Sequence, residues 1–193
     1  MDLKELEQEW IQLTLGRPCV VLLRKAEGPL KGRATRSQES KMARQLEHEI
    51  KDFLIKQGVS ADLIKTTVSH TSTSAGSWVM GAGSDQRIGI DLESSQRRVH
   101  PRVGFRLLTR AESNLGLSIL EAWVAKEAAF KANPNNSGTL LPQYQITGWD
   151  AGNRTGEIQL PPTEGEMGVC RFKVVASENW LVGMAVFFPS KGV

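Results

Sequence analysis

The chain has 193 residues, a formal net charge of +3, and 40% hydrophobic and 23% charged residues. This length buries an adequate core as one domain or two small halves, the composition excludes a disordered chain, and a charge of +3 does not by itself indicate nucleic-acid binding. Its two cysteines stand apart, and no apolar run approaches the roughly 20 residues that span a bilayer. We therefore expect a cytoplasmic protein that binds neither nucleic acid nor membrane.

The first half of the chain predicts two helices and several short strands. Apolar residues at helical spacing predict a short helix over 3–14 and a long one from its N-cap Ser37 to Gly58. The run Val20–Leu23 between them is typical of a strand. Beyond Gly58, short runs separated by Ser, Thr and Gly predict a β-meander with strands at 66–70, 78–80 and 88–93.

The second half repeats this order of elements. A basic stretch over 96–106 precedes a helix predicted over 110–132, with Thr109 as N-cap and Asn133-Pro134 as its stop. Strands are expected at 144–149, 157–160, 170–176 and 180–188. The chain is therefore predicted to be α+β, with two similar halves, 1–98 and 99–193, each a long helix packed on a mostly antiparallel sheet.

The segment Ile88–Glu93 places two carboxylates on one face of a strand. Strict alternation sends its three large apolar residues to one side and Gly89, Asp91 and Glu93 to the other. Like charges this close repel each other, which a bound cation would relieve. The alternative is an exposed acid pair that binds nothing.

A helix face carries a third acid. Trp123, Glu127 and Lys131 are spaced i, i+4, i+8. A surface Glu–Lys pair worth about 0.2–0.5 kcal/mol explains this spacing equally well. Together with Asp91 and Glu93, however, Glu127 completes an all-oxygen set of the kind that suits Mg²⁺.

Two further features each leave a structural and a functional interpretation open. His70 stands near the end of a predicted strand, where a lone histidine is commonly structural. Five basic residues, Lys31, Arg33, Arg36, Lys41 and Arg44, cluster early in the chain and are either a solvated helix face or part of a site for an anion.

Three segments in order resemble the signature motifs of the 4′-phosphopantetheinyl transferases. They are Ser69-His70, the run Gly89-Ile90-Asp91-Leu92-Glu93, and Trp123 with Lys126-Glu127-Ala128 and Lys131. The similarity is strongest over 67–131 and includes 105–112. The order of helices and strands also resembles the single-chain surfactin-synthetase-activating type, whose fold is a pseudo-dimer.

The resemblance implies a transfer reaction. Coenzyme A would be the co-substrate, and its phosphopantetheine arm would pass to a serine of an apo acyl or peptidyl carrier protein, releasing adenosine 3′,5′-bisphosphate. Asp91, Glu93 and Glu127 would hold Mg²⁺, with Glu127 also the base for the serine. Lys131 would hold the pantetheine phosphate, and Lys126 would steady the charge nearby.

The resemblance also implies where CoA binds. It would lie between the halves, with the Ser69-His70 motif beside it and His70 on its 3′-phosphate, while Arg33, Arg36 and Arg44 would complete that anion site. The chain departs from the family pattern in having Thr71 after His70 and no Gly-Lys-Pro-like loop between Gly58 and Ser69. A noncatalytic module that binds CoA or a carrier protein on the same fold is the alternative function.

Overall fold

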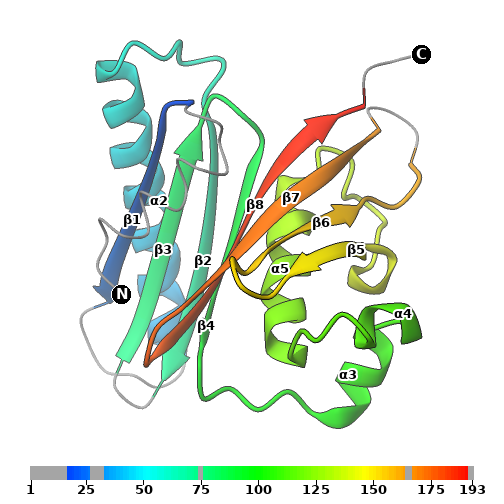
Figure 1. The fold of residues 1–193 in the computed structure, drawn as a ribbon. Helices are drawn as coiled ribbons and strands as arrows, with labels where there is room; N and C mark the ends of the chain where they lie inside the picture. The colour runs from blue at the N-terminus through cyan, green and yellow to red at the C-terminus, as the bar shows by residue number, and fades with distance from the viewer. Residues whose placement is uncertain (1–16, 27–32, 74–75, 164–166, 191–193) are drawn as a thin grey trace.

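The computed structural model describes residues 17–26, 33–73, 76–163 and 167–190, so the helix expected over 3–14 lies outside the described residues. Figure 1 shows two blocks, each a sheet covered by one long helix. In chain order the elements are β1 (Cys19–Ala26), α2 (Arg33–Lys56), β2 (Lys65–Thr73), β3 (Gly76–Ser84), β4 (Ile88–Ser94), α3 (Pro101–Leu107), α4 (Arg110–Ser113), α5 (Ile119–Ala132), η1 (Leu141–Gln143), β5 (Gln145–Asp150), β6 (Thr155–Gln159), β7 (Gly168–Ala176) and β8 (Trp180–Pro189).

The strands form two antiparallel sheets, which confirms the predicted α+β class. The first sheet has the order β1-β3-β2 and the second the order β4-β8-β7-β6-β5. The predicted hairpin of β2 and β3 is present, but the expectation that β4 continues the same meander is wrong, because β4 pairs with β8. Nearly all of β4 is buried, which requires a packed layer on each of its faces. The division of the chain at residue 98 stays a prediction.

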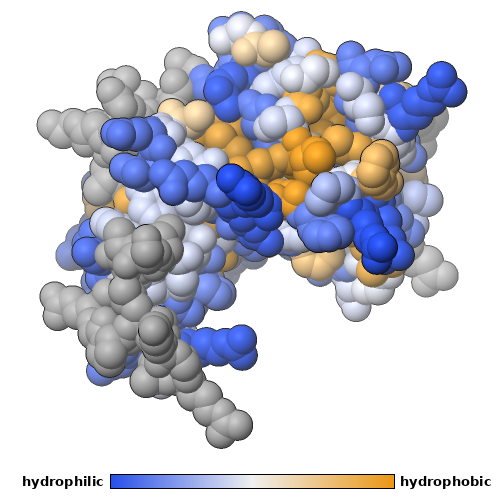
Figure 2. All heavy atoms as spheres, turned by 90° about the horizontal axis from the view of Figure 1, so that it is seen from below, coloured by the Kyte–Doolittle hydropathy of each residue, from blue (hydrophilic) through white to orange (hydrophobic). Residues whose placement is uncertain are grey.

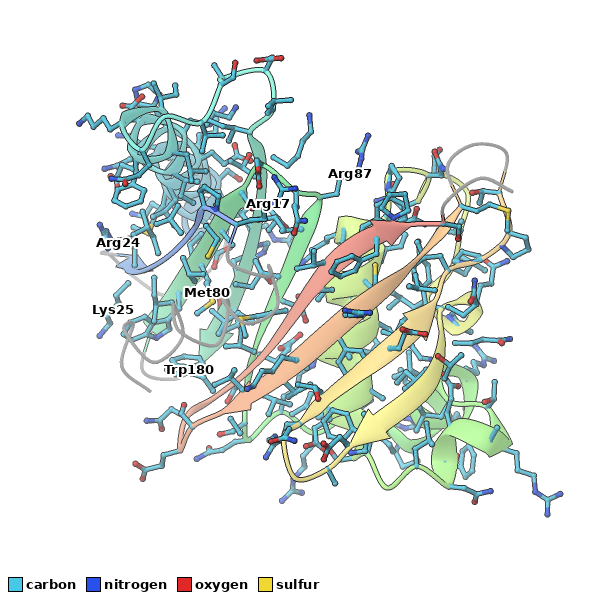
Figure 3. The ribbon with its side chains drawn as sticks, turned by 45° about the horizontal axis from the view of Figure 1, so that its top comes forward. Arg17, Arg24, Lys25, Met80, Arg87 and Trp180 are labelled. Carbon is cyan, nitrogen blue, oxygen red and sulfur yellow. The ribbon has the colours of Figure 1, made fainter. Side chains whose placement is uncertain are left out.

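The layers run in the order α2, first sheet, second sheet, α5. One core lies between α2 and the first sheet and contains Ile50 and Leu54. A second core joins the two sheets; Figure 3 labels Met80 of β3, which belongs to this core, and Trp180 of β8, which packs against it. The third and largest core lies between α5 and the second sheet, around Phe172. The second core holds the two blocks together by apolar contact rather than by a shared strand ladder.

The helix predicted over 110–132 is in fact two helices. Thr109 caps α4 as predicted, in a capping box with Glu112. Gly116 then adopts a positive φ of 82°, which an α-helix does not tolerate, and Ser118 opens α5 with a capping box of its own. The break turns α5 onto the second sheet independently of the segment before it.

Two other helices differ from the prediction. The long helix α2 begins at Arg33, so Ser37 lies inside its first turns rather than at its N-cap. The basic stretch contains α3, which begins with Pro101 after the capping side chain of His100. None of the helices in the described ranges combines the length and apolar character that a bilayer crossing requires.

Two glycines bring α5 into direct contact with the second sheet. A Cβ on Gly89 of β4 would lie 1.9 Å from the carbonyl oxygen of Ala128, and one on Gly183 of β8 would lie 2.2 Å from the carbonyl oxygen of Val124. A glycine in a strand makes room either for a ligand or for another backbone, and at Gly89 the structure shows a backbone. This close approach fixes the height of α5 above β4.

We predict that Gly89→Ala destabilises the protein by about 1–3 kcal/mol, the usual effect of overpacking. The new methyl group would meet the backbone of α5, which cannot move aside as a flexible side chain can. Urea unfolding measures the change. Gly148→Ala is the matched control, because a Cβ there meets nothing within 4 Å and the change should stay within about 0.5 kcal/mol. Equal losses in both variants would contradict the close-contact argument.

Candidate functional site

The alternation predicted for β4 is present. Ile88, Ile90 and Leu92 pack into the core between the sheets. Gly89 and Asp91 face α5, as the Gly89 contact with Ala128 and the Asp91 contact with Lys131 show. The strand therefore uses its apolar residues for packing and brings its polar residues to the helix.

Asp91 of β4 accepts hydrogen bonds from the first sheet and from α5. Its Oδ1 atom accepts hydrogen bonds from Lys131 Nζ at 2.8 Å and from Ser69 Oγ of β2 at 2.9 Å. Ser69 also accepts a hydrogen bond from the Leu92 N–H. The Asp91 side chain is only 8% exposed. Its other oxygen, Oδ2, is buried and has no hydrogen-bond partner among the described residues. A buried carboxylate oxygen without a donor is costly unless a ligand supplies one.

Glu127 of α5 lies close enough to Asp91 of β4 to feel its charge. Burial raises the pKa of Glu127, the negative charge of Asp91 raises it further, and the positive charges of Lys131 and Arg97 oppose this shift. The charged form of Glu127 is therefore short of compensating positive charge. Asp91, Glu127 and Lys131, which the sequence placed in one site, are together in the structure.

Glu93 is paired with an arginine. Its Oε1 accepts a hydrogen bond from Arg97, whose guanidinium lies 5.0 Å from the centre of the Trp123 ring. In the ranges that the structure describes, no three His, Cys, Asp or Glu side chains form a ready-made metal-binding group. Glu93 therefore lies on the same strand as Asp91, but Arg97 holds its carboxylate.

Lys126 does not lie with these residues. Its side chain is 0% exposed, and its ammonium pairs with Glu112 at 2.7 Å and donates to the carbonyl of Leu107. Burial lowers the pKa of Lys126, with Glu112 acting against that shift. The structure does not support the expected role of Lys126 in steadying the charge near the pantetheine phosphate, because its fully enclosed ammonium pairs with Glu112 and offers no surface to a ligand.

Glu112, the partner of Lys126, contacts three elements of the second block. Glu112 of α4 accepts hydrogen bonds from Thr109 N and from Ile146 N of β5 as well as from Lys126. Burial alone would raise the pKa of Glu112, but the hydrogen bonds from Lys126 and from the two backbone N–H groups outweigh burial, and the pKa is lowered. The pair positions α4, α5 and β5.

Ser69 and His70 point to opposite faces of β2. Whereas Ser69 faces Asp91, the exposed His70 has its Nε2 atom 3.8 Å from Oε2 of Glu39 on α2. The buried Glu39 also accepts hydrogen bonds from Ser72 and Ser77. Three arginines were expected near His70: Arg36 and Arg44 are exposed on α2, and Arg33 begins this helix with a side chain outside the described residues.

Sequence reasoning missed three residues that contact the predicted ones, namely Glu39, Arg97 and Glu112. Arg97 follows Glu93 by four residues, but the spacing carries no information outside a helix, and a Ser94–Arg97 turn brings the two together. Glu112 belongs to a capping-box pattern with Thr109, which is visible in the sequence, although its pairing with Lys126 is not. No local sequence pattern indicates that Glu39 lies beside His70.

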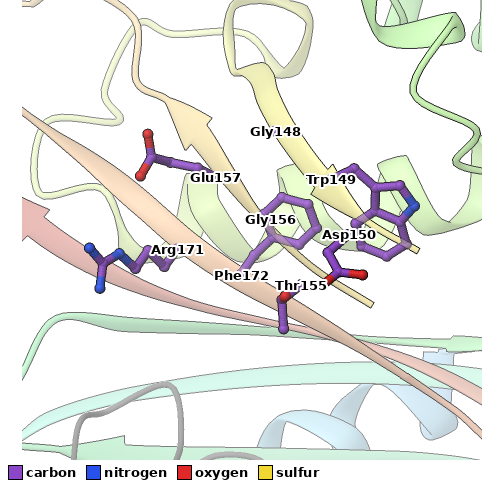
Figure 4. A pocket seen from close by; sticks show the side chains of 8 residues that line it. All are labelled: Gly148, Trp149, Asp150, Thr155, Gly156, Glu157, Arg171 and Phe172. Carbon is purple, nitrogen blue, oxygen red and sulfur yellow. The ribbon is translucent and has the colours of Figure 1, made fainter. Parts of the chain in front are cut away.

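A hollow of about 440 Å³ lies at the other edge of the second sheet. Figure 4 shows Gly148, Trp149 and Asp150 of β5 around it, with residues of β6 and β7. Trp149 and Phe172 stack there at 5.7 Å between ring centres. Because β4 and β5 are opposite edges of the sheet, this hollow is separate from Asp91.

A hydrophobic surface surrounds α3. Phe105 is 86% exposed, and Val103 and Ile119 are also exposed. A cavity of about 320 Å³ beside them is lined by Gly104, Leu108 and other residues of this region. Figure 2 shows a broad hydrophobic area on this side of the molecule. An exposed aromatic residue over an apolar cavity is typical of a binding surface.

Comparisons with known proteins give no family for this chain. No protein-family model matches it, and no curated protein matches it.

Proposed function

We propose that the protein is a magnesium-dependent 4′-phosphopantetheinyl transferase. The observation that carries the proposal is the arrangement of Asp91, Glu127 and Lys131, in which a strand carboxylate with an unpartnered buried oxygen lies against a helix that supplies a second acid and an ammonium. All three residues belong to the motifs that resemble this family. Such a group suits the transfer of a phosphate-linked arm, which depends on positioning and charge.

The residues fit a divalent cation. Asp91 Oδ2 needs a positive partner, and burial, together with the negative charge of Asp91, raises the pKa of Glu127, so its ionised form would also be favoured by a nearby cation. Asp91 and Glu127 would hold Mg²⁺, with Glu93 joining them once its carboxylate turns from Arg97. When bound, the ion would neutralise the pyrophosphate of CoA and orient it for attack.

Glu127 and Lys131 would have different tasks. Glu127 would accept the proton of the carrier serine, a poor nucleophile that gains roughly 10²–10⁴-fold from a positioned base. Lys131 is partly exposed and uses two of its three N–H donors on Ile90 and Asp91, so the third remains to bind a phosphate oxygen. Asp91 thus orients Lys131.

The carrier protein would dock on the surface around α3. Phe105 offers an apolar anchor beside the cavity, and α3 and α4 also carry exposed arginines: Arg102, Arg106 and Arg110. An apolar centre with positive charges on the same helices complements an acidic helix with one apolar face.

We further propose that the two blocks correspond to the halves of a pseudo-dimer, with β4 of the first half completing the second sheet. Each block has a helix that crosses glycines of its own sheet, since Gly81 and Gly83 lie beneath α2 as Gly89 and Gly183 lie beneath α5. CoA would bind between the blocks at the edge strand β2, with its pyrophosphate beside Asp91 and its 3′-phosphate beside His70 on the α2 side of this strand, where Arg36 is exposed. Glu39 would keep the His70 ring in place.

A transfer assay tests this function. The protein is incubated with CoA, Mg²⁺ and a panel of apo acyl and peptidyl carriers, and mass spectrometry detects the added phosphopantetheine. Transfer that disappears with EDTA is expected. Binding of CoA without transfer to any carrier would favour the noncatalytic module instead.

A further inference from the structure

Arg97 occupies a position that the proposed reaction leaves unexplained. The Ser94–Arg97 turn after β4 directs its guanidinium onto Glu93 and over the face of Trp123. Its positive charge also acts on Glu127. Arg97 therefore touches or influences two of the three acids that would hold the metal.

A purely structural role explains little of this contact. Arg97 is 41% exposed, and ion pairs with so much solvent access contribute only about 0–1 kcal/mol to stability. Besides Glu93, the guanidinium contacts the face of the Trp123 ring, and this contact lacks the directional hydrogen bonds that would fix its orientation. An arginine so placed can exchange a carboxylate for a phosphate group, because the guanidinium fork binds the oxygens of either anion in pairs.

The local charges show when that exchange is favourable. Without a ligand, the three carboxylates face two cations, Lys131 and Arg97, so Arg97 stands where a metal would have to bind Glu93. These five side chains carry a small net negative charge. A divalent cation alone would make the net charge of the site positive, whereas a divalent cation together with the negatively charged pyrophosphate would return it to a small negative value. Release of Glu93 by Arg97 is therefore favoured only when both arrive.

We propose, on the basis of the proposed function, that Arg97 is a phosphate-binding residue that holds Glu93 in the free protein and moves to the pyrophosphate of CoA when the metal binds. This exchange couples the two ligands: phosphate draws Arg97 away and frees Glu93 for the metal, while the metal displaces Arg97 toward phosphate. By linkage, each ligand raises the affinity for the other by the same factor.

Titration with Mn²⁺ tests the proposal without any transfer reaction. Free Mn²⁺ is followed by EPR in the presence and absence of inorganic pyrophosphate, with correction for the complex that Mn²⁺ forms with pyrophosphate in solution. Arg97→Gln should bind Mn²⁺ alone roughly 5–10-fold more tightly than the wild type, and pyrophosphate should enhance its Mn²⁺ affinity less by a similar factor. Arg97→Lys, which keeps the charge but not the planar fork, should fall between the two.

Arg98→Gln is the matched control, because it removes the same charge from the neighbouring exposed position. If Arg97→Gln binds Mn²⁺ no more tightly than the wild type, or if Arg98→Gln has the same effect, the role of Arg97 is refuted while the proposed transfer remains. If neither protein binds Mn²⁺ even with pyrophosphate, the metal site itself is refuted, and the role of Arg97 with it.

Discussion

Replacing Glu127 by Gln should reduce phosphopantetheine transfer by roughly 10²–10⁴-fold, the usual contribution of a positioned base. The amide keeps the size of the side chain but can neither accept the serine proton nor serve Mg²⁺ as an anionic ligand. Mass spectrometry of an apo carrier measures the loss, with Glu47→Gln on α2 as the control for the same chemical change. Full activity in Glu127→Gln would remove Glu127 from the site.

The same variant should not lose stability. Because the pKa of Glu127 is raised above its ordinary value of 4.5, ionising this carboxyl lowers the stability of the wild-type fold as the pH rises through the folded-state pKa. In EDTA, Glu127→Gln should therefore unfold at an equal or higher temperature than the wild type at pH 7.5, with the difference fading toward pH 4.5. A marked loss of stability at pH 7.5 would show that Glu127 supports the fold.

Replacing Lys126 by Met should destabilise the protein by about 3–5 kcal/mol, because it leaves the carboxylate of Glu112 buried without its cation. Urea unfolding at pH 7 measures this loss. The double variant Lys126→Met with Glu112→Gln should recover part of it, since the uncompensated charge is then absent.

Lys131 offers the matched comparison on the same helix. Lys131 is 25% exposed and Ser69 still donates to Asp91 without it, so Lys131→Met should destabilise the protein by about 1–3 kcal/mol, less than Lys126→Met, while impairing transfer. The two lysines thus separate structural from functional roles. A stable Lys126→Met protein with weakened CoA binding would contradict the structural role of Lys126 and would show that Lys126 takes part in CoA binding.

The sequence predicted most elements of the fold because their signals are local. Alternation and turn residues located the strands, and Thr109 located the N-cap of α4. The partner of β4 was not predictable, because pairing with β8 depends on contacts between segments about 90 residues apart, for which the chain carries no local pattern. The break before α5 depends on Gly116, and a single glycine in a helical pattern is often tolerated.

The candidate site was predictable to a similar extent. Spacing placed Asp91 on one strand face and Glu127 with Lys131 on one helix face, and the structure brings these faces together. The resemblance also assigned Lys126 to the ligand, but helical geometry turns adjacent residues about 100° apart, and Lys126 faces α4 instead. Arg97 could not have been found, because its position depends on a turn whose direction only the folded chain defines.

The hydroxyl of Ser69 has a consequence for how the chain could be divided. It reaches from β2 in the first sheet to Asp91 and the Leu92 N–H in the second, so the carboxylate at the centre of the site takes its orientation from both blocks. A fragment that carries only the second sheet and α5 would contain every proposed metal ligand and still leave Asp91 incorrectly supported. Activity from separately expressed fragments would therefore require that they reassemble.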